Sequence, residues 1–209
     1  MPAADTKDRI LDAAEKLFAN HGYDATSVRA IATAAGVNLA AINYHFQSKD
    51  ALLHAVYARR AGPVNARRLE LLDEFEAAAG GRPLTPELIL EAFLQPIAEL
   101  GDRVGHIPRM MVRLQYVEQG PTFEKVFETH FRPMFMRFFQ ALKRALPGLG
   151  EDELFWRLQF TVGAFAHIMA SGFALKMRGR KKAGAEQLQR QLIAYASAGF
   201  RAEPVEREQ

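Results

Sequence analysis

Apolar residues recur with a helical period along almost the whole of this chain. In residues 6–20 the side chains of Ile10, Leu11, Ala14, Leu17 and Phe18 form one stripe, a spacing typical of an amphipathic α-helix. No run of residues alternates between apolar and polar as a half-buried strand would. The pattern therefore predicts an all-α fold, with an N-terminal three-helix unit joined to a larger C-terminal helical bundle and about nine helices in total.

Turn residues and caps set the expected helix boundaries. Gly22, Gly36 and the Gly80-Gly81 pair are suited to the backbone beyond a helix C-terminus. Pro63 removes an amide donor and crowds the preceding turn, so we expect it to kink or interrupt the fourth helix. The helices are predicted over residues 6–20, 26–35, 39–45, 48–79, 85–100, 107–118, 121–146, 151–178 and 185–200.

Composition excludes several classes of protein. Apolar residues make up 49% of the 209 residues and charged residues 24%, which are globular proportions. The absence of cysteine excludes disulfides, thiol nucleophiles and thiolate metal sites. Residues 158–175 carry no Asp, Glu, Lys or Arg, but they include Gln159, Thr161 and His167, so a buried packing helix is favoured over a membrane span. With no signal peptide at the N-terminus, we expect a soluble, cytoplasmic protein.

Two short helices separated by Gly36-Val37-Asn38 have the dimensions of a helix-turn-helix. Ile42 and Phe46, four residues apart, are expected to anchor the inner face of its second helix. Its outward face would then suit a major groove, where an asparagine amide pairs with an adenine edge and small apolar groups contact a thymine methyl. That face consists of Leu39, Ala40, Asn43 and Tyr44.

Most of the hydroxyl, amide and basic side chains that flank this unit lie at the starts of its helices, where free amide donors and the helix dipole attract an anion. Tyr44 and His45 lie between two of these starts and can donate to backbone oxygens. These side chains are therefore candidate phosphate contacts, although each hydroxyl or amide alone is also a common helix cap and each basic group a common solvated charge. Residues 1–60 hold seven basic and six acidic side chains, so position rather than charge supports DNA binding. The candidates are Thr26, Ser27, Arg29, Asn38, Tyr44, His45, Ser48 and Lys49.

The segment from Ile10 to Leu53 resembles the TetR family of transcriptional regulators, through residues 22–32, Ala35-Gly36-Val37 and residues 44–49. The resemblance implies a homodimer that binds a palindromic operator and is released by a small ligand. It implies a DNA-binding domain over residues 1–55 and a ligand-binding and dimerisation domain over residues 56–209. It also implies backbone or groove contacts by Thr26, Arg29, Tyr44, His45 and Lys49, whereas Asn43 stands where many members carry tyrosine.

A narrower resemblance runs from Val37 to Phe46, followed by Arg59-Arg60, Pro63 and Asn65. It is similar to the branch that contains a fatty-acid-responsive regulator of β-oxidation and stress genes from pseudomonads. This resemblance implies a fatty acid or acyl-CoA as the effector.

The C-terminal half is rich in phenylalanine and methionine, a composition that fills a core but also surrounds apolar ligands. Among these apolar residues stand polar groups that could bind a ligand's head. Plain core packing is the alternative for most of them. The candidate pocket residues are Met110, Arg113, Tyr116, Phe127, His130, Phe131, Phe160 and His167.

Small residues in the last two helices, including Gly163, Leu192, Ala196 and Gly199, suit a close helix crossing. We expect residues 151–178 and 185–200 to form a two-fold homodimer interface. The alternative is that these helices pack only within the monomer.

The favoured function is a ligand-responsive transcriptional regulator, acting as a repressor on double-stranded DNA. One alternative is a helical adaptor that binds a protein or acidic surface without reading DNA. An all-α enzyme is the other, but the chain has no Gly-rich phosphate loop and no nucleophile elbow. The six histidines never fall three or four residues apart, so we expect no helix-borne metal pair. We also expect no cofactor and no membrane partner.

Overall fold

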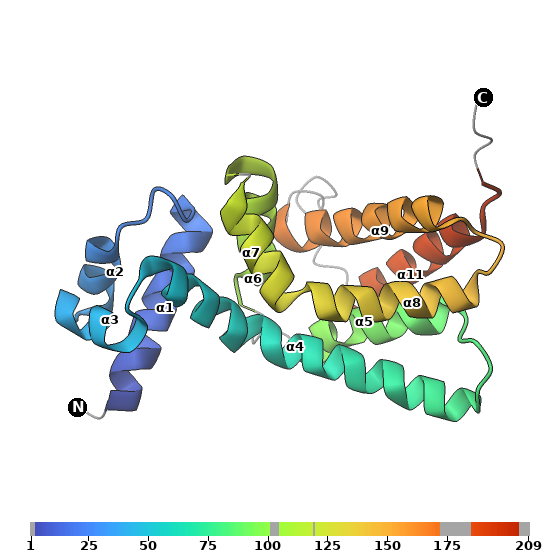
Figure 1. Ribbon diagram of the computed structural model, residues 1–209, viewed down its shortest axis with the longest axis horizontal. Helices are drawn as coiled ribbons and strands as arrows, with labels where there is room; N and C mark the ends of the chain where they lie inside the picture. Colours follow the sequence, from blue (N-terminus) through green and yellow to red (C-terminus); the bar gives the residue numbers. More distant parts are fainter. Residues whose placement is uncertain (1–2, 101–104, 119, 172–184, 205–209) are drawn as a thin grey trace. The chain divides into compact units, whose positions relative to one another are not determined.

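The computed structural model describes residues 3–100, 105–118, 120–171 and 185–204 (Figure 1). The chain divides into two compact units. Unit 1 contains Met1–Pro63 and Asp102–His130, and unit 2 contains Val64–Gly101 and Phe131–Gln209. Every regular element in the described ranges is helical, so the prediction of an all-α fold is confirmed.

Unit 1 contains the N-terminal helices α1 (Ala3–His21), α2 (Val28–Ala35) and α3 (Leu39–Phe46), and α4 (Lys49–Ala79) begins in it. A later segment of the chain packs into the same unit. It consists of α6 (Ile107–Arg113), the π-helical turn η2 (Leu114–Glu118) and α7 (Pro121–His130). The apolar stripe of α1 is buried here, with Ile10 and Ala14 fully inaccessible, as an amphipathic helix requires.

Unit 2 contains the remainder of α4 with α5 (Pro86–Leu100), α8 (Arg132–Ala145), α9 (Glu151–Ser171) and α11 (Ala185–Arg201). One apolar cluster joins all five helices, with Leu72, Leu90, Phe138, Leu158 and Phe200 among its members. The buried guanidinium of Arg157 on α9 donates hydrogen bonds to the carbonyl oxygens of Gly199, Phe200 and Ala202. Those bonds satisfy orphan carbonyls at the end of α11 and hold it against α9.

Two expectations about helix continuity have different outcomes. Of the two effects expected of Pro63, an interruption is excluded, because α4 continues through it to Ala79, and a kink stays a prediction. The single helix predicted over residues 121–146 is instead two helices that part at Phe131. Pro133 lies in the first turn of α8 and has no N–H for the carbonyl of Thr129, so it begins a helix rather than continuing one.

The uncharged stretch over residues 158–175 is helical as far as Ser171, and its remainder lies outside the described residues. Its Leu158 and Thr161 are buried within unit 2. In the ranges that the structure describes, no helix is both long enough and apolar enough to cross a bilayer.

Candidate nucleic-acid interface

The turn between α2 and α3 is closed by a glycine in the left-handed region. Gly36 has φ of 64°, a conformation that residues with a Cβ adopt at a cost, and its N–H bonds to the end of α2. The Gly36 carbonyl oxygen in turn accepts a hydrogen bond from Nη2 of Arg9 on α1, at 2.9 Å. The glycine turn and the hydrogen bond from Arg9 together stabilise the tight connection between the two short helices that a helix-turn-helix requires.

Helix α3 divides its residues as the sequence predicted. Ile42 and Phe46 are 2% and 4% exposed, so they anchor the helix to unit 1. Tyr44 is 81% exposed and Leu39 40%, and Ala40 and Asn43 are exposed beside them. The predicted outward face is therefore confirmed as a surface, and its contact with base edges stays a prediction.

Three of the flanking polar side chains act as helix caps. Ser27 accepts a hydrogen bond from the N–H of Ala30, and Ser48 from the N–H of Ala51, at 3.1 and 3.0 Å. Asn38 Oδ1 accepts from the N–H of Ala41 at 2.8 Å. These bonds stabilise the first turns of α2, α4 and α3. Capping uses only the acceptor oxygens of these exposed residues. Their hydroxyl and amide N–H groups therefore remain able to donate hydrogen bonds to a phosphate.

Thr26 differs from its neighbours because it is 2% exposed. Its hydroxyl donates to the carbonyl oxygen of Gly22 at 2.5 Å, within the loop that leads into α2. The threonine therefore stabilises this loop from inside the protein. A contact of the Thr26 side chain with DNA stays a prediction, and the burial of this side chain does not support it.

Two of the basic candidates, Arg29 and Lys49, lie at helix starts, and Arg29 in the first turn of α2 is exposed. His45 instead lies in the last turn of α3, half-buried and with its ring in T-shaped contact with Tyr44. The ammonium of Lys49 lies 4.1 Å from the ring centre of Tyr23, whose hydroxyl donates to Asp50. The cation–π contact restrains the lysine at the start of α4. A positively charged group is thus held beside the capped N-terminus of that helix.

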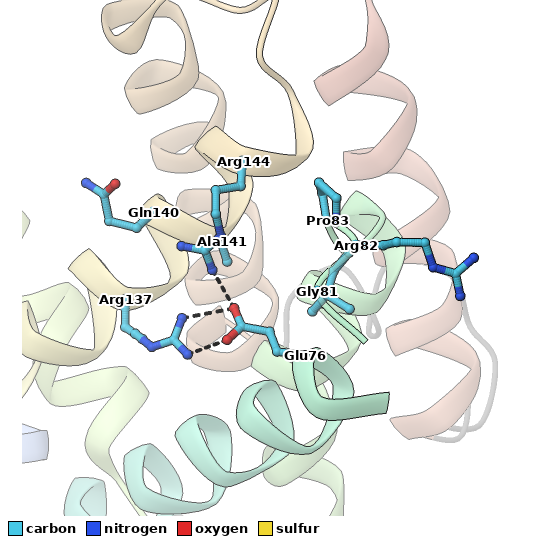
Figure 2. Close-up of a pocket in the computed structure, with 9 residues that line it drawn as sticks. Glu76, Gly81, Arg82, Pro83, Arg137, Gln140, Ala141 and Arg144 are labelled. Carbon is cyan, nitrogen blue, oxygen red and sulfur yellow. Dashed lines mark hydrogen bonds and ion pairs between the residues drawn. The ribbon is translucent and has the colours of Figure 1, made fainter. Parts of the chain in front are cut away.

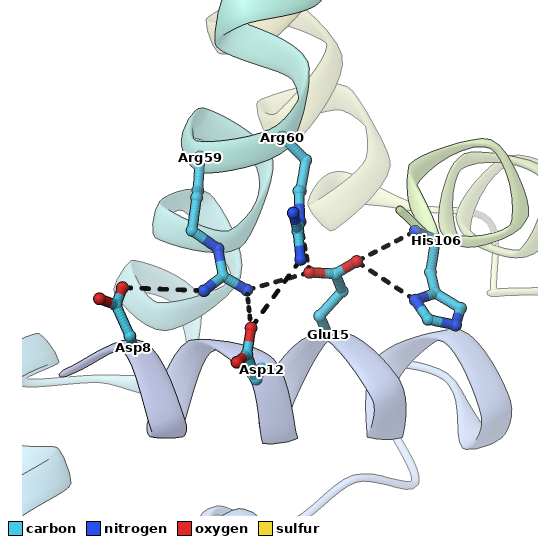
Figure 3. A network of polar contacts seen from close by, with 6 residues as sticks. All are labelled: Asp8, Asp12, Glu15, Arg59, Arg60 and His106. Carbon is cyan, nitrogen blue, oxygen red and sulfur yellow. Dashed lines mark hydrogen bonds and ion pairs between the residues drawn. The ribbon is translucent and has the colours of Figure 1, made fainter. Parts of the chain in front are cut away.

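A buried carboxylate that the sequence did not reveal joins the N-terminal helices to the segment before α6 (Figure 3). Glu15 on α1 is 2% exposed. Its Oε2 accepts hydrogen bonds from Arg60 Nε at 2.7 Å and Arg59 Nη2 at 3.0 Å, and its Oε1 accepts from the N–H of His106 at 3.0 Å. Burial alone would raise the pKa of Glu15, but the hydrogen bonds from Arg60 and His106 outweigh it and lower the pKa.

A second set of contacts joins the same two segments at the C-terminal end of α1. The N–H of Tyr23 donates to Oε1 of Glu118 in η2 at 2.8 Å. Arg113 Nη2 donates to the carbonyl oxygen of His21 at 2.7 Å. The loop entering the helix-turn-helix is therefore bound to the π-helical turn, a kind of helix irregularity often found at functional sites.

The eight predicted pocket residues are divided between the two units. In unit 1, Met110 and Arg113 line a cavity of about 10 Å³, about the space of one water molecule. His130 Nε2 lies 2.9 Å from Nδ1 of His54. The pKa of His130 is lowered mainly by burial and to a smaller extent by the nearby His54. The remaining residues are placed as follows: Tyr116, Phe160 and His167 are exposed, and Phe127 and Phe131 are half-buried.

A larger cavity of about 410 Å³ lies in unit 2, and none of the eight predicted residues lines it (Figure 2). Glu76 on α4 faces Arg137 and Arg144 of α8 across it, and its carboxylate accepts hydrogen bonds from both. Arg137 also donates to Asp73 at 2.7 Å. The charges of Arg137 and Arg144 are therefore balanced by carboxylates of α4.

Comparisons with known proteins agree with this geometry. The sequence pattern described as "Bacterial regulatory proteins, tetR family" matches residues 10–56, and that described as "Tetracyclin repressor-like, C-terminal domain" matches residues 91–199, just over half of the chain. The HTH-type transcriptional regulator AcrR of Shigella flexneri is 39% identical over 83 residues, which span 40% of this chain and only 37% of that protein. SrpR of Pseudomonas putida is 25% identical over 204 residues, 95% of this chain and 84% of SrpR.

Solved structures support the same fold at low sequence identity. The hemolysin II transcriptional regulator HlyIIR has a TM-score of 0.63 at 20% identity, covering 93% of this chain and 98% of its own. The fatty acid degradation regulator FadR from Bacillus halodurans has a TM-score of 0.64 at 17% identity, covering 95% and 97%. The two matching domain patterns show that the chain belongs to the TetR family.

Proposed function

We propose that this protein represses transcription by binding a palindromic operator as a homodimer, and that a small apolar or acyl effector releases it. In this proposal residues 1–55 bind DNA, and residues 56–209 bind the effector and the second copy. The observation that carries the proposal is the exposed face of α3 between capped helix N-termini. Such a face places side chains in a major groove while the flanking groups contact phosphates.

The homodimer is supported by open stripes on α9 and α11. On α9, Trp156 and Phe160 are 57% and 68% exposed, with Gly163 one turn further along. A Cβ added at Gly163 or at Gly199 on α11 would meet no atom within 4 Å. Stripes of exposed aromatics and small residues suit a close two-fold helix contact.

Two residues that the sequence analysis assigned to this interface are instead buried inside unit 2. Leu192 and Ala196 of α11 are 7% and 4% exposed, because they belong to the apolar cluster of unit 2. Tyr195 on the same helix is 74% exposed. The proposed interface therefore uses the adjacent stripe of α11 that holds Tyr195 and Gly199.

An apolar effector is supported by the aromatic interior of unit 2, where Phe93 contacts Phe138 and Phe165 edge-on. The name of the B. halodurans neighbour as a fatty acid degradation regulator supports an acyl ligand. The two recognition helices of a dimer must enter grooves about 34–36 Å apart. An effector that favours a state with another spacing therefore weakens operator binding by a population shift.

The test is binding of the purified protein to the DNA upstream of its own gene, with and without acyl ligands. Asn43→Ala and Tyr44→Ala are each expected to weaken binding about tenfold or more, since one base contact is worth about 1–3 kcal/mol. Because both side chains are exposed, the melting temperature should change little. Affinity is measured by fluorescence anisotropy, and folding by circular dichroism.

The matched control is Asn20→Ala, which removes another exposed amide, from α1, and should leave affinity unchanged. Operator affinity should also fall steeply with added salt and differ between duplexes. Binding that is equal for all duplexes, or unaffected by both α3 substitutions, would contradict the proposal and favour an adaptor.

A further inference from the structure

Arg68 on α4 places a guanidinium inside the helical core of unit 2. Arg68 is only 5% exposed. Burial lowers the pKa of Arg68 to about 9, which still leaves the group charged at neutral pH. A cation at this depth is disfavoured unless the surrounding groups balance its charge.

The groups around Arg68 are polar but neutral. Its Nε donates to the carbonyl oxygen of Phe93 at 2.8 Å, and its Nη1 donates to Oδ1 of Asn65 at 3.1 Å. The guanidinium carbon lies 4.0 Å from the ring centre of Phe93. Among the residues that the structure describes, none accepts a hydrogen bond from Nη2, and no carboxylate forms an ion pair with Arg68.

Arg157 shows how the same unit treats another buried arginine. It is 8% exposed, and its guanidinium has Glu153 one helical turn away at 2.9 Å. Arg67, the neighbour of Arg68 on α4, pairs with Glu70, Glu74 and Glu99. Both of these arginines therefore have a carboxylate partner, whereas Arg68 forms no ion pair with a carboxylate of the described residues.

The apolar surroundings indicate the kind of molecule that would complete this site. Phe93, over which the guanidinium lies, packs edge-on against Phe138 at 5.4 Å and Phe165 at 6.1 Å between ring centres. A guanidinium binds the oxygens of a carboxylate or phosphate strongly, and aromatic side chains bind an alkyl chain. Both requirements are met by one amphipathic anion.

We infer that Arg68 is the counter-charge for the anionic head of the effector, whose apolar part lies among the phenylalanines of unit 2. This inference rests on the proposed function and adds to it the charge of the ligand. It predicts that head-group charge, rather than chain length alone, determines effector binding.

The test compares ten-carbon ligands that differ only in the head, each below its micellar concentration: decanoate, decyl phosphate, decanol and decylamine. Calorimetry should show that the full-length wild-type protein binds an anion about tenfold or more tightly than decanol, as charge-assisted hydrogen bonds allow. Decylamine should bind most weakly. The ratio of decanoate to decyl phosphate affinity identifies the kind of anionic head.

Arg68→Met should abolish the preference for the anion, and Arg68→Lys should retain part of it. The control Arg67→Met removes a paired arginine one residue away and should keep the full preference. If Arg68→Met does not fold, the wild-type series and Arg68→Lys still decide. Equal affinity for decanoate and decanol, or a preference that survives in Arg68→Met, overturns the inference.

Operator binding measured on the same preparations separates the two proposals. Wild-type protein that binds its operator but shows no preference for anions overturns only the role of Arg68. Protein that prefers anions through Arg68 but binds no operator overturns the proposed repressor instead.

Discussion

Replacing Trp156 and Phe160 together by aspartate is expected to give a folded monomer that binds the operator about 100- to 10,000-fold more weakly, the usual gain from linking two binding units. Both side chains are exposed on α9 and stack at 6.3 Å between ring centres. In the proposed dimer they would be buried against the second copy. Two carboxylates there would have to lose their hydration, which opposes association.

The oligomeric state is measured by analytical ultracentrifugation and the operator affinity by anisotropy on the same samples. A matched control replaces Leu88 and Met136, two exposed apolar residues elsewhere in unit 2, by aspartate. That variant should remain dimeric and bind normally. A dimer that persists in the Trp156/Phe160 variant would show that these helices pack only within the monomer.

Glu15→Ala is expected to lower the free energy of unfolding by about 3 kcal/mol, because removing one partner from a buried charge network leaves the others uncompensated. Arg59 and Arg60 are only about a quarter exposed, and both bond to the Glu15 carboxylate. The N–H of His106 would lose its acceptor as well. Urea unfolding followed by circular dichroism measures the change.

The control is Asp12→Ala, which removes a more exposed carboxylate bonded to the same Arg59. Since exposed ion pairs contribute about 1 kcal/mol or less, its effect should be much smaller. Equal losses for Glu15→Ala and Asp12→Ala would show that burial of Glu15 is not the cause.

Acid should weaken the contribution of Glu15. Because the pKa of Glu15 is lower in the folded state than its ordinary value of 4.5, the folded protein binds this proton less readily than the unfolded chain. The stabilisation is therefore complete above about pH 4.5 and is lost as pH falls through the lowered pKa. The difference in stability between wild type and Glu15→Gln should shrink from pH 6 to pH 3, and a constant difference would contradict this assignment.

Much of the local structure of the candidate interface could be predicted from the sequence. The helix-turn-helix, its glycine turn and the inner and outer faces of α3 depend on residues within a few positions of one another. The structure confirms them through the buried Ile42 and Phe46 and the exposed Tyr44. Whether Ser27, Asn38 and Ser48 also contact phosphate was open from the sequence, and the structure adds that they cap helices.

One local error had a visible cause. The apolar and aromatic pattern over residues 121–146 is continuous, and it concealed the break at Phe131 that Pro133 produces. Because proline has no N–H to donate, the sequence could have predicted that Pro133 lies in the first turn of a new helix. Pro63, with the same chemistry, lies inside α4 instead, so a proline alone does not determine where a helix ends.

The sequence by itself determined the all-helical architecture and the exposed face of α3 that we propose contacts DNA, since both follow from helical periodicity and from short-range capping and turn chemistry. Only the tertiary structure decided which charges are buried and with what partners. Glu15 meets Arg60 and His106 from positions 45 and 91 residues away, and Arg68 meets the carbonyl of Phe93. In the sequence all of these resemble ordinary solvated side chains, because burial depends on which distant segments pack together.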